Sequence, residues 1–202
     1  MKIDIHTHIM PEHMPNWVQK FGYGEFIHLE HRNCKACMMK GDKVFREVEE
    51  NCFRETARIK DMDEMAVDVQ VLSTIPVLFN YWAKSKDAHE TARFFNDHIA
   101  ETVAKESQRF IGLGTVPLQD VELSIKEMRR CIDELKLPGL EIGTNVNGKN
   151  LGEKEFFPFY EAAEKSGSAL FIHPWEMMGE KEMQKYWLPW LVGMPAETTR
   201  AI

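Results

Sequence analysis

Two histidines separated by a single residue, His6 and His8, stand among the first eight residues of the chain. Side chains on a β-strand alternate between its two faces, so in a strand both imidazoles would share one face with Asp4, while Ile3 and Ile5 would point the other way. Two neutral imidazoles held about 6 to 7 Å apart by the strand repeat can bind the same divalent metal ion. A metal site normally needs three or four ligands, so without another ligand the pair reads as two solvated surface histidines.

His173 can supply that third ligand, because it directly follows the apolar run 169–172, which reads as a buried strand. The carboxyl ends of parallel barrel strands lie at the same end of the barrel, which would bring His173 to His6 and His8. An all-imidazole set favours zinc, which acts as a Lewis acid and lowers the pKa of a bound water. We therefore predict one Zn²⁺ on these histidines, against the alternative that His173 is a buried structural residue.

A second group of metal-binding residue types occurs at a three-residue spacing, at His28, His31, Cys34 and Cys37. Zinc knuckles normally join two separated ligand pairs by a longer loop, so we interpret this group as a coincidence of the surface. The four cysteines of the chain are expected to be free thiols.

Strand and helix patterns alternate along the chain. Strands are predicted at 1–8, 67–72, 110–116, 140–143 and 169–172, and helices at 54–65, 87–106, 120–135 and 156–165. This alternation predicts parallel βα units, and the absence of a glycine-rich phosphate loop after the first strand favours a barrel over an open doubly wound sheet. Five strands fall short of the eight that close a TIM-like (β/α)8 barrel, and residues 196–202 read as the start of one more helix. We therefore predict an incomplete barrel of the metal-dependent hydrolase type, with both sheet edges and the apolar side of the first strand uncovered.

Residues 12–50 follow neither the helical nor the strand periodicity of apolar residues. We therefore predict a small insertion or flap there, within a single unit that spans 1–202. A turn at Gly41-Asp42 followed by the β-prone Val44 and Phe45 predicts a short hairpin that carries Arg46. The guanidinium of Arg46 is then either a solvated charge or a bidentate clamp for a substrate carboxylate.

The composition restricts the class of ligand. With 202 residues, of which 44% are hydrophobic, the chain can bury one hydrophobic core. Its net charge of -7 provides no positive potential that would attract nucleic acid. Its longest apolar stretch, 187–194, is far shorter than the roughly 20 residues that span a membrane, and no secretory signal is expected at the start. We predict a cytoplasmic protein that acts on a small molecule.

Several longer runs resemble the metal-dependent decarboxylases of the amidohydrolase superfamily. They are Lys2 to His8, Leu72 to Pro76, Gly112 to Thr115, Phe171 to Trp175 and Tyr186 to Thr199. The last run is far more specific than two spaced histidines. The resemblance implies a distorted barrel with a small inserted domain and one zinc ion on His6, His8 and His173.

The same resemblance assigns the substrate site. It implies that Arg46 binds a substrate carboxylate, and that Lys40, Phe45, Trp175 and Trp190 lie in or beside the pocket. The acid/base histidine of the sixth strand, the metal-binding aspartate of the eighth and an arginine from a dimer partner would lie beyond Ile202. We therefore expect no certain catalytic residue within 1–202, no activity of this segment alone, and a homodimer at full length.

The implied reaction is the zinc-dependent, non-oxidative decarboxylation of a semialdehyde carboxylate in tryptophan degradation through kynurenine, which limits quinolinate and NAD synthesis. Activated water would add to the conjugated substrate, a proton would reach the carboxylate-bearing carbon, and CO2 and then water would leave. Another decarboxylase or hydrolase of the superfamily would use the same histidines. A non-catalytic chain that only binds metal or pairs with full-length subunits is the alternative from a different class.

Overall fold

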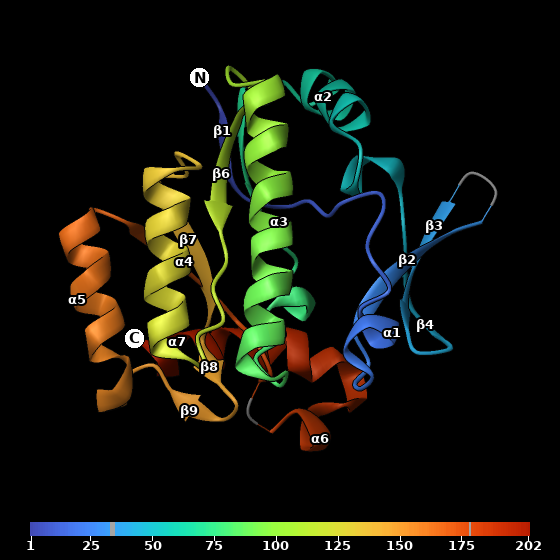
Figure 1. Cartoon of the computed structure of the whole chain (residues 1–202). Coiled ribbons are helices and arrows are strands. Elements are labelled where there is room, and N and C mark those ends of the chain that lie inside the picture. Colours follow the sequence, from blue (N-terminus) through green and yellow to red (C-terminus); the bar gives the residue numbers. More distant parts are fainter. Residues whose placement is uncertain (33–34, 178) are drawn as a thin grey trace.

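The computed structural model describes residues 1–32, 35–177 and 179–202, and its centre is a curled sheet of parallel strands (Figure 1). The sheet has five strands in the spatial order β1 (Ile3–His8), β5 (Val69–Ser73), β6 (Phe110–Gly114), β7 (Gly139–Gly143) and β10 (Ala169–His173). The helices that connect them are α2 (Glu55–Glu64), α3 (Ser85–Lys105), α4 (Val121–Asp133) and α5 (Phe157–Ser166). This is the incomplete (β/α) barrel that the sequence predicts.

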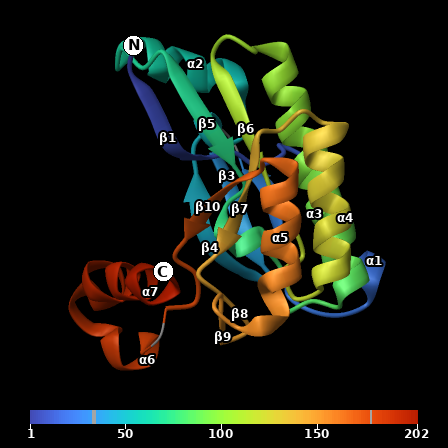
Figure 2. The ribbon, with the colours of Figure 1, turned by 90° about the vertical axis from the view of Figure 1, so that its left-hand side faces the viewer.

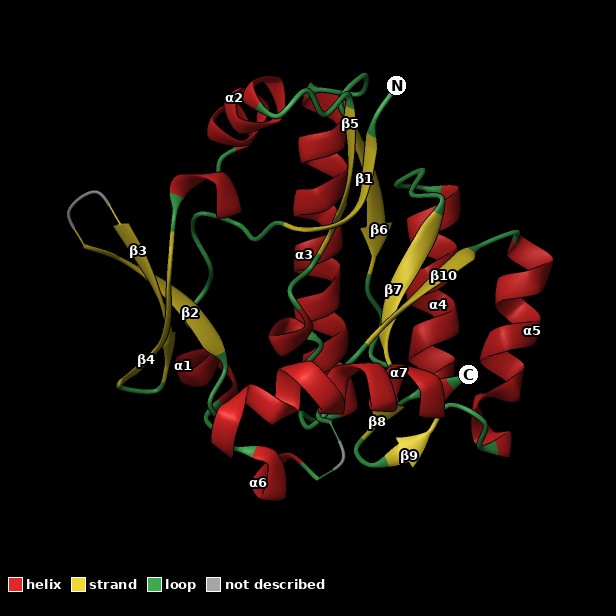
Figure 3. Ribbon diagram, turned by 180° about the vertical axis from the view of Figure 1, so that it is seen from behind, coloured by secondary structure: helices red, strands yellow, loops and turns green. Residues whose placement is uncertain are grey.

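The long helices α3, α4 and α5 lie side by side over one face of the sheet, and Figure 3 shows the sheet from its other face. The core between helices and sheet contains a large apolar cluster, in which Ile99, Met128 and Phe159 from the helices meet Leu72 and Leu140 from the strands. Burial of each such side chain contributes about 1.5 to 3 kcal/mol to folding. This packing fixes the strands whose ends carry the polar residues.

Two helix boundaries have clear local causes in the sequence. Asp120 caps α4, because its carboxylate accepts a hydrogen bond from the backbone N–H of Leu123 at 3.1 Å. Gly167 ends α5 in the left-handed conformation with φ 64°, which glycine adopts without a steric penalty.

The first strand departs from strict alternation. In its pairing with β5, Asp4 lies opposite Gln70 and Thr7 lies opposite Leu72, so β1 holds one extra residue between these pairs and forms a bulge. Asp4 lies beside Gln70, and its carboxylate is 3.5 Å from the Nε2 atom of that residue. The Oε1 atom of Gln70 in turn accepts a hydrogen bond from Arg58 of α2. Asp4 therefore contacts Gln70 and does not belong to the histidine group described below.

Two apolar residues of β1 remain in contact with solvent. Ile3 is 44% exposed and Ile5 is 61% exposed. The expectation that the apolar side of the first strand is uncovered in a five-stranded sheet is confirmed.

A second, antiparallel sheet lies beside the main one (Figure 1). It consists of three strands, β2 (Ile27–Arg32), β3 (Lys35–Lys40) and β4 (Lys43–Val48), and is preceded by the short helix α1 (Trp17–Phe21). The predicted hairpin is confirmed as the turn between β3 and β4, where Gly41 has a φ of 57°. Strand β2 and helix α1 were not predicted.

The C-terminal segment lies at the carboxyl end of the main sheet (Figure 2). It contains α6 (Glu180–Met183) and α7 (Met194–Ala201), and α7 confirms the helix predicted at 196–202. A small strand pair, β8 (Asn145–Val146) and β9 (Lys149–Asn150), contacts this segment, because Asn145 donates a hydrogen bond to Glu197 at 3.2 Å.

Single-turn helices occupy Glu50–Cys52, Pro76–Leu78, Lys154–Phe156, Lys185–Trp187 and Pro189–Gly193. Among the described residues, no helix combines the length and apolarity needed to cross a membrane.

Candidate metal centre

The three predicted histidine ligands come together at one point. Each of His6, His8 and His173 offers a ring nitrogen, and these nitrogens lie within 4.8 Å of one another. The ring centroids of His6 and His173 are 4.8 Å apart, and that of His8 is 5.2 Å from each of the other two. Within 1–32, 35–177 and 179–202 this is the one group of three or more His, Cys, Asp or Glu side chains that converge in this way.

Backbone carbonyls orient two of these rings. The Nδ1 atom of His8 lies 3.0 Å from the carbonyl oxygen of Thr74 and 3.1 Å from the hydroxyl of Ser73. The Nδ1 atom of His173 lies 2.8 Å from the carbonyl oxygen of Pro174. Because a carbonyl oxygen can only accept, these contacts assign the ring proton to Nδ1 and leave the lone pair of Nε2 available for a metal ion.

The environment keeps the rings of His8 and His173 neutral. Burial, followed by the neighbouring His173 and His6, lowers the pKa of His8 to about 3. Burial also lowers the pKa of His173 below its usual value. Neutral imidazole is the form that ligates metals, so the chemistry of these donors fits a divalent transition metal such as zinc.

One buried acidic residue beside the histidine group, Glu141, was not predicted from the sequence as a site residue. Glu141 of β7 has no exposed surface, and its Oε1 atom lies 3.8 Å from Nδ1 of His8. Burial raises the pKa of this carboxyl group well above its usual value. A glutamate between Leu140 and Ile142, both buried apolar residues, was the available signal, because acids are rarely placed in fully buried strands without a role.

A cavity of about 460 Å³ connects the centre to the small sheet. It is lined by His8 together with Phe45 and Arg46 of β4, and by Cys52 and Ile75 at its sides. The Arg46 side chain is exposed and makes no hydrogen bond or ion pair with a residue that the structure describes. Its guanidinium is therefore available to an anionic ligand in the same cavity as a metal-ligand candidate.

The other predicted pocket residues do not line this cavity. The Nζ atom of Lys40 lies 3.5 Å from a carboxylate oxygen of Glu25 at the surface. The backbone carbonyl of Trp175, which follows His173 by two residues, accepts a hydrogen bond from Asn145 at 2.7 Å. Trp190 lies in the C-terminal segment and is 47% exposed.

The alternative zinc knuckle is not assembled by the described residues. Strands β2 and β3 pair with Glu30 opposite Cys37 and His31 opposite Ala36, so His31 and Cys37 point to opposite faces of the small sheet. Cys34, the remaining cysteine of that group, lies outside the described residues. Cys37, Cys52 and Cys131 are free thiols, as predicted.

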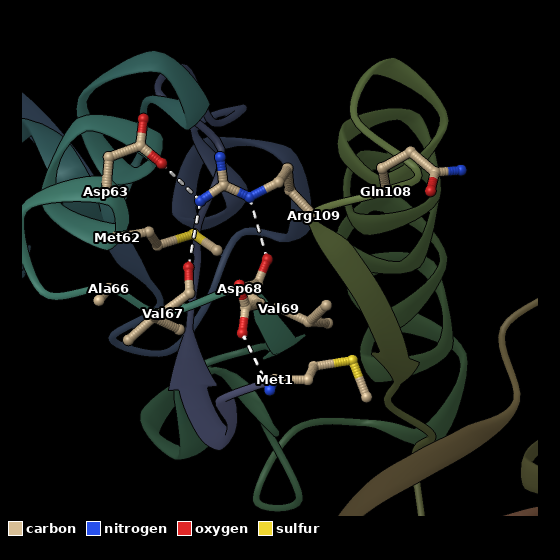
Figure 4. Close-up of a pocket in the computed structure, with 9 residues that line it drawn as sticks. All are labelled: Met1, Met62, Asp63, Ala66, Val67, Asp68, Val69, Gln108 and Arg109. Carbon is tan, nitrogen blue, oxygen red and sulfur yellow. Dashed lines mark hydrogen bonds and ion pairs between the residues drawn. The ribbon is translucent and has the colours of Figure 1, made fainter.

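A larger cavity of about 750 Å³ lies at the opposite, amino end of the strands (Figure 4). Its charged groups pair with each other, since Arg109 contacts Asp63 at 2.8 Å and the terminal amine of Met1 lies 3.8 Å from Asp68. Parallel βα barrels carry their chemistry at the carboxyl ends of the strands. We therefore interpret this cavity as part of the structural framework.

Comparison with known proteins agrees with the fold. The amidohydrolase family model matches residues 3–202, so the chain belongs to the amidohydrolase family. Among curated proteins, it is 56% identical over 203 residues to the 2-amino-3-carboxymuconate-6-semialdehyde decarboxylase of Dictyostelium discoideum, with 100% of this chain and 56% of that protein covered. It is 35% identical to the protein of the same name from Caenorhabditis elegans, and the match covers 100% of this chain and 63% of that protein. The chain thus spans 56% to 63% of the length of these relatives.

Solved structures confirm the architecture. The 5-carboxyvanillate decarboxylase from Sphingomonas paucimobilis superposes with a TM-score of 0.77 at 25% identity, over 98% of this chain and 60% of that one. A dihydroxybenzoic acid decarboxylase from a Polaromonas species was solved with manganese and 2-nitroresorcinol. It superposes with a TM-score of 0.73 at 24% identity, and the match covers 98% of this chain and 57% of that chain. The predicted resemblance to decarboxylases of this superfamily is confirmed.

Proposed function

We propose that the chain forms the metal-binding part of a Zn²⁺-dependent carboxy-lyase that decarboxylates 2-amino-3-carboxymuconate-6-semialdehyde. The convergence of His6, His8 and His173 carries the proposal, because it brings three imidazole nitrogen donors from the two edge strands of the sheet to one point. The identity of 56% to a relative with this name supports the choice of substrate.

The residues of the chain have distinct tasks in this proposal. His6, His8 and His173 hold the ion through ring nitrogens, and a bound Zn²⁺ supplies a Lewis acid and an activated water. Arg46 binds a substrate carboxylate through paired N–H donors and so orients the substrate in the cavity beside His8. Phe45 lines the same cavity and offers the substrate an apolar contact.

Lys40, Trp175 and Trp190 belong to this proposal as pocket residues of the complete protein. They come from the tip of the small sheet, from the loop after β10 and from the C-terminal segment. Residues that the longer relatives have after this stretch would complete the pocket and supply the acid/base group.

Zinc is the metal of the proposal because three imidazoles form a ligand set that suits it. The related Polaromonas decarboxylase was solved with manganese, so the metal needs a direct assay. The proposal further includes a cytosolic homodimer at full length, acting in tryptophan degradation and diverting carbon from quinolinate and NAD synthesis.

The experiment uses the chain extended after residue 202 to the length of its relatives, loaded with zinc. Loss of 2-amino-3-carboxymuconate-6-semialdehyde is followed by absorbance, with release of CO2 as the second readout. A specificity constant at least about 100-fold above that for aromatic acids is expected.

An aromatic-acid decarboxylase is the second candidate, because a 5-carboxyvanillate decarboxylase shares the fold over 98% of this chain. The same assay with 5-carboxyvanillate and γ-resorcylate tests it. A preference for either acid over the semialdehyde would overturn the proposed substrate but keep the metal centre.

A further inference from the structure

We propose that Glu141 is a positioning residue of the metal centre, which acts on the ion through His8. The inference rests on the proposed metal-binding function and deepens it. Sequence periodicity gives Glu141 no role, and the chemistry described above does not use it.

The first observation is the isolation of the carboxyl group. Glu141 is completely buried, and neither carboxyl oxygen forms a hydrogen bond of good geometry with a described residue, although the Ser73 hydroxyl is near enough to favour its charged form. A buried polar group without a partner typically costs about 1 to 3 kcal/mol of stability, so its presence calls for a function. Leu140 and Ile142, its neighbours on β7, point into the apolar core, which leaves Glu141 on the opposite face of the sheet.

The second observation is the position of Glu141 relative to the histidines. Glu141 lies opposite Phe171 in the pairing of β7 with β10, and the ring of Phe171 packs against His6 with centroids 5.3 Å apart. His173 follows Phe171 by two residues and so shares its face of β10. Glu141 thus belongs to the inner face of the half-barrel, where the three histidines converge.

The third observation is the atom of His8 that Glu141 faces. The nearest approach is 3.8 Å, between Oε1 and Nδ1, the ring nitrogen that bears the proton. Glu141 therefore lies behind the ring, on the side away from the Nε2 lone pair, and does not bind the ion itself. The Nδ1 proton is already donated to the carbonyl of Thr74, and 3.8 Å exceeds a hydrogen-bond distance, so Glu141 holds the ring orientation by packing and increases the donor strength of Nε2 through its electrostatic field.

Zinc affinity of the 202-residue chain tests this inference, measured by competition with a chromophoric chelator. Glu141→Gln keeps the shape of the side chain, and we expect it to weaken zinc binding about 10- to 100-fold without lowering Tm. Glu127→Gln is the matched control. Glu127 is also buried, but its carboxylate accepts hydrogen bonds from Arg130 and Asn96 between α3 and α4. The control should lower Tm while zinc affinity stays within about twofold.

If Glu141→Gln does not fold, Glu141→Met replaces the acid by an apolar side chain of similar length, and the same loss of affinity is expected. Wild-type affinity in a folded Glu141 variant would overturn the inference alone. Absence of zinc binding by the wild-type chain would overturn the proposed function and the inference together.

Discussion

His8 and His173 belong to the strands at opposite edges of the main sheet, and yet their ring centroids lie only 5.2 Å apart. A flat sheet of five strands would separate its edges by roughly 19 Å, at about 4.8 Å per strand spacing. The curl of the half-barrel therefore brings together the histidines of the proposed metal centre, and changes that flatten the sheet should weaken metal binding.

Gly139 tests the dependence on sheet curvature. An added Cβ at Gly139 would lie 2.5 Å from the carbonyl oxygen of Ala169, so Gly139→Ala should push β10 away from β7 and displace His173. We expect a lower Tm and a zinc affinity reduced by at least about tenfold. Gly152→Ala is the control, because its Cβ would meet a single side-chain oxygen at 3.2 Å. Equal zinc affinity in both variants would contradict the role of curvature.

Arg46 is expected to act on the substrate and not on the metal. In the extended, active protein, Arg46→Ala should lower kcat/KM by the equivalent of about 2 to 5 kcal/mol, because a substrate carboxylate loses its charged partner. Zinc content should be unchanged. Lys43→Ala, an exposed cation on the same strand, should leave the kinetics intact. Unchanged kinetics in Arg46→Ala would make Arg46 a solvated surface charge.

The alternation of strands and helices was predictable because each helix has an apolar face and each buried strand is an apolar run. The cap Asp120 and the terminator Gly167 were predictable because they act locally. The position of His173 beside the other two histidines was predictable because it ends a parallel strand, and such strand ends meet at one end of the sheet.

Other features depend on contacts that are distant in sequence. The bulge in β1 arises from its pairing with β5, and no local pattern specifies it. Strand β2 has Ile27 and Leu29 on alternate positions, but His28 between them and the polar run from Glu30 to Arg32 made the segment resemble a polar loop. Glu141 is one residue in a short strand, and its relation to His8 appears only when the sheet curls.

Residues 1–202 by themselves are expected to bind zinc but not to decarboxylate. The histidine group contains no aspartate from the described part of the chain, and the sheet supplies five of the eight strands of a closed barrel. A missing acid/base group alone typically reduces the rate by 10² to 10⁴. Turnover of the semialdehyde by the 202-residue chain within about tenfold of the extended protein would contradict this expectation.

His98 makes stability dependent on pH. Burial on α3, followed by the nearby charge of Lys105, lowers the pKa of His98 to about 4 in the folded state, although Glu55 opposes the shift. The unfolded chain, with a pKa near 6.5, binds the proton more readily, so stability falls as pH decreases from about 6.5 toward 4. Between pH 7 and pH 5 the wild-type chain should lose about 2 kcal/mol more free energy of unfolding than His98→Gln, measured by urea denaturation. Equal losses in the two proteins would show that His98 does not titrate in this way.

The zinc content of the purified 202-residue chain tests the central claim most directly, measured by elemental analysis after removal of loosely bound metal. We predict about one zinc per wild-type chain and per Cys34→Ser/Cys37→Ser variant, and less than about one tenth of that in His6→Ala/His8→Ala. Circular dichroism should show that all three proteins are folded. Stoichiometric zinc in the folded histidine variant, together with its loss from the cysteine variant, would contradict the account and place the metal at the small sheet.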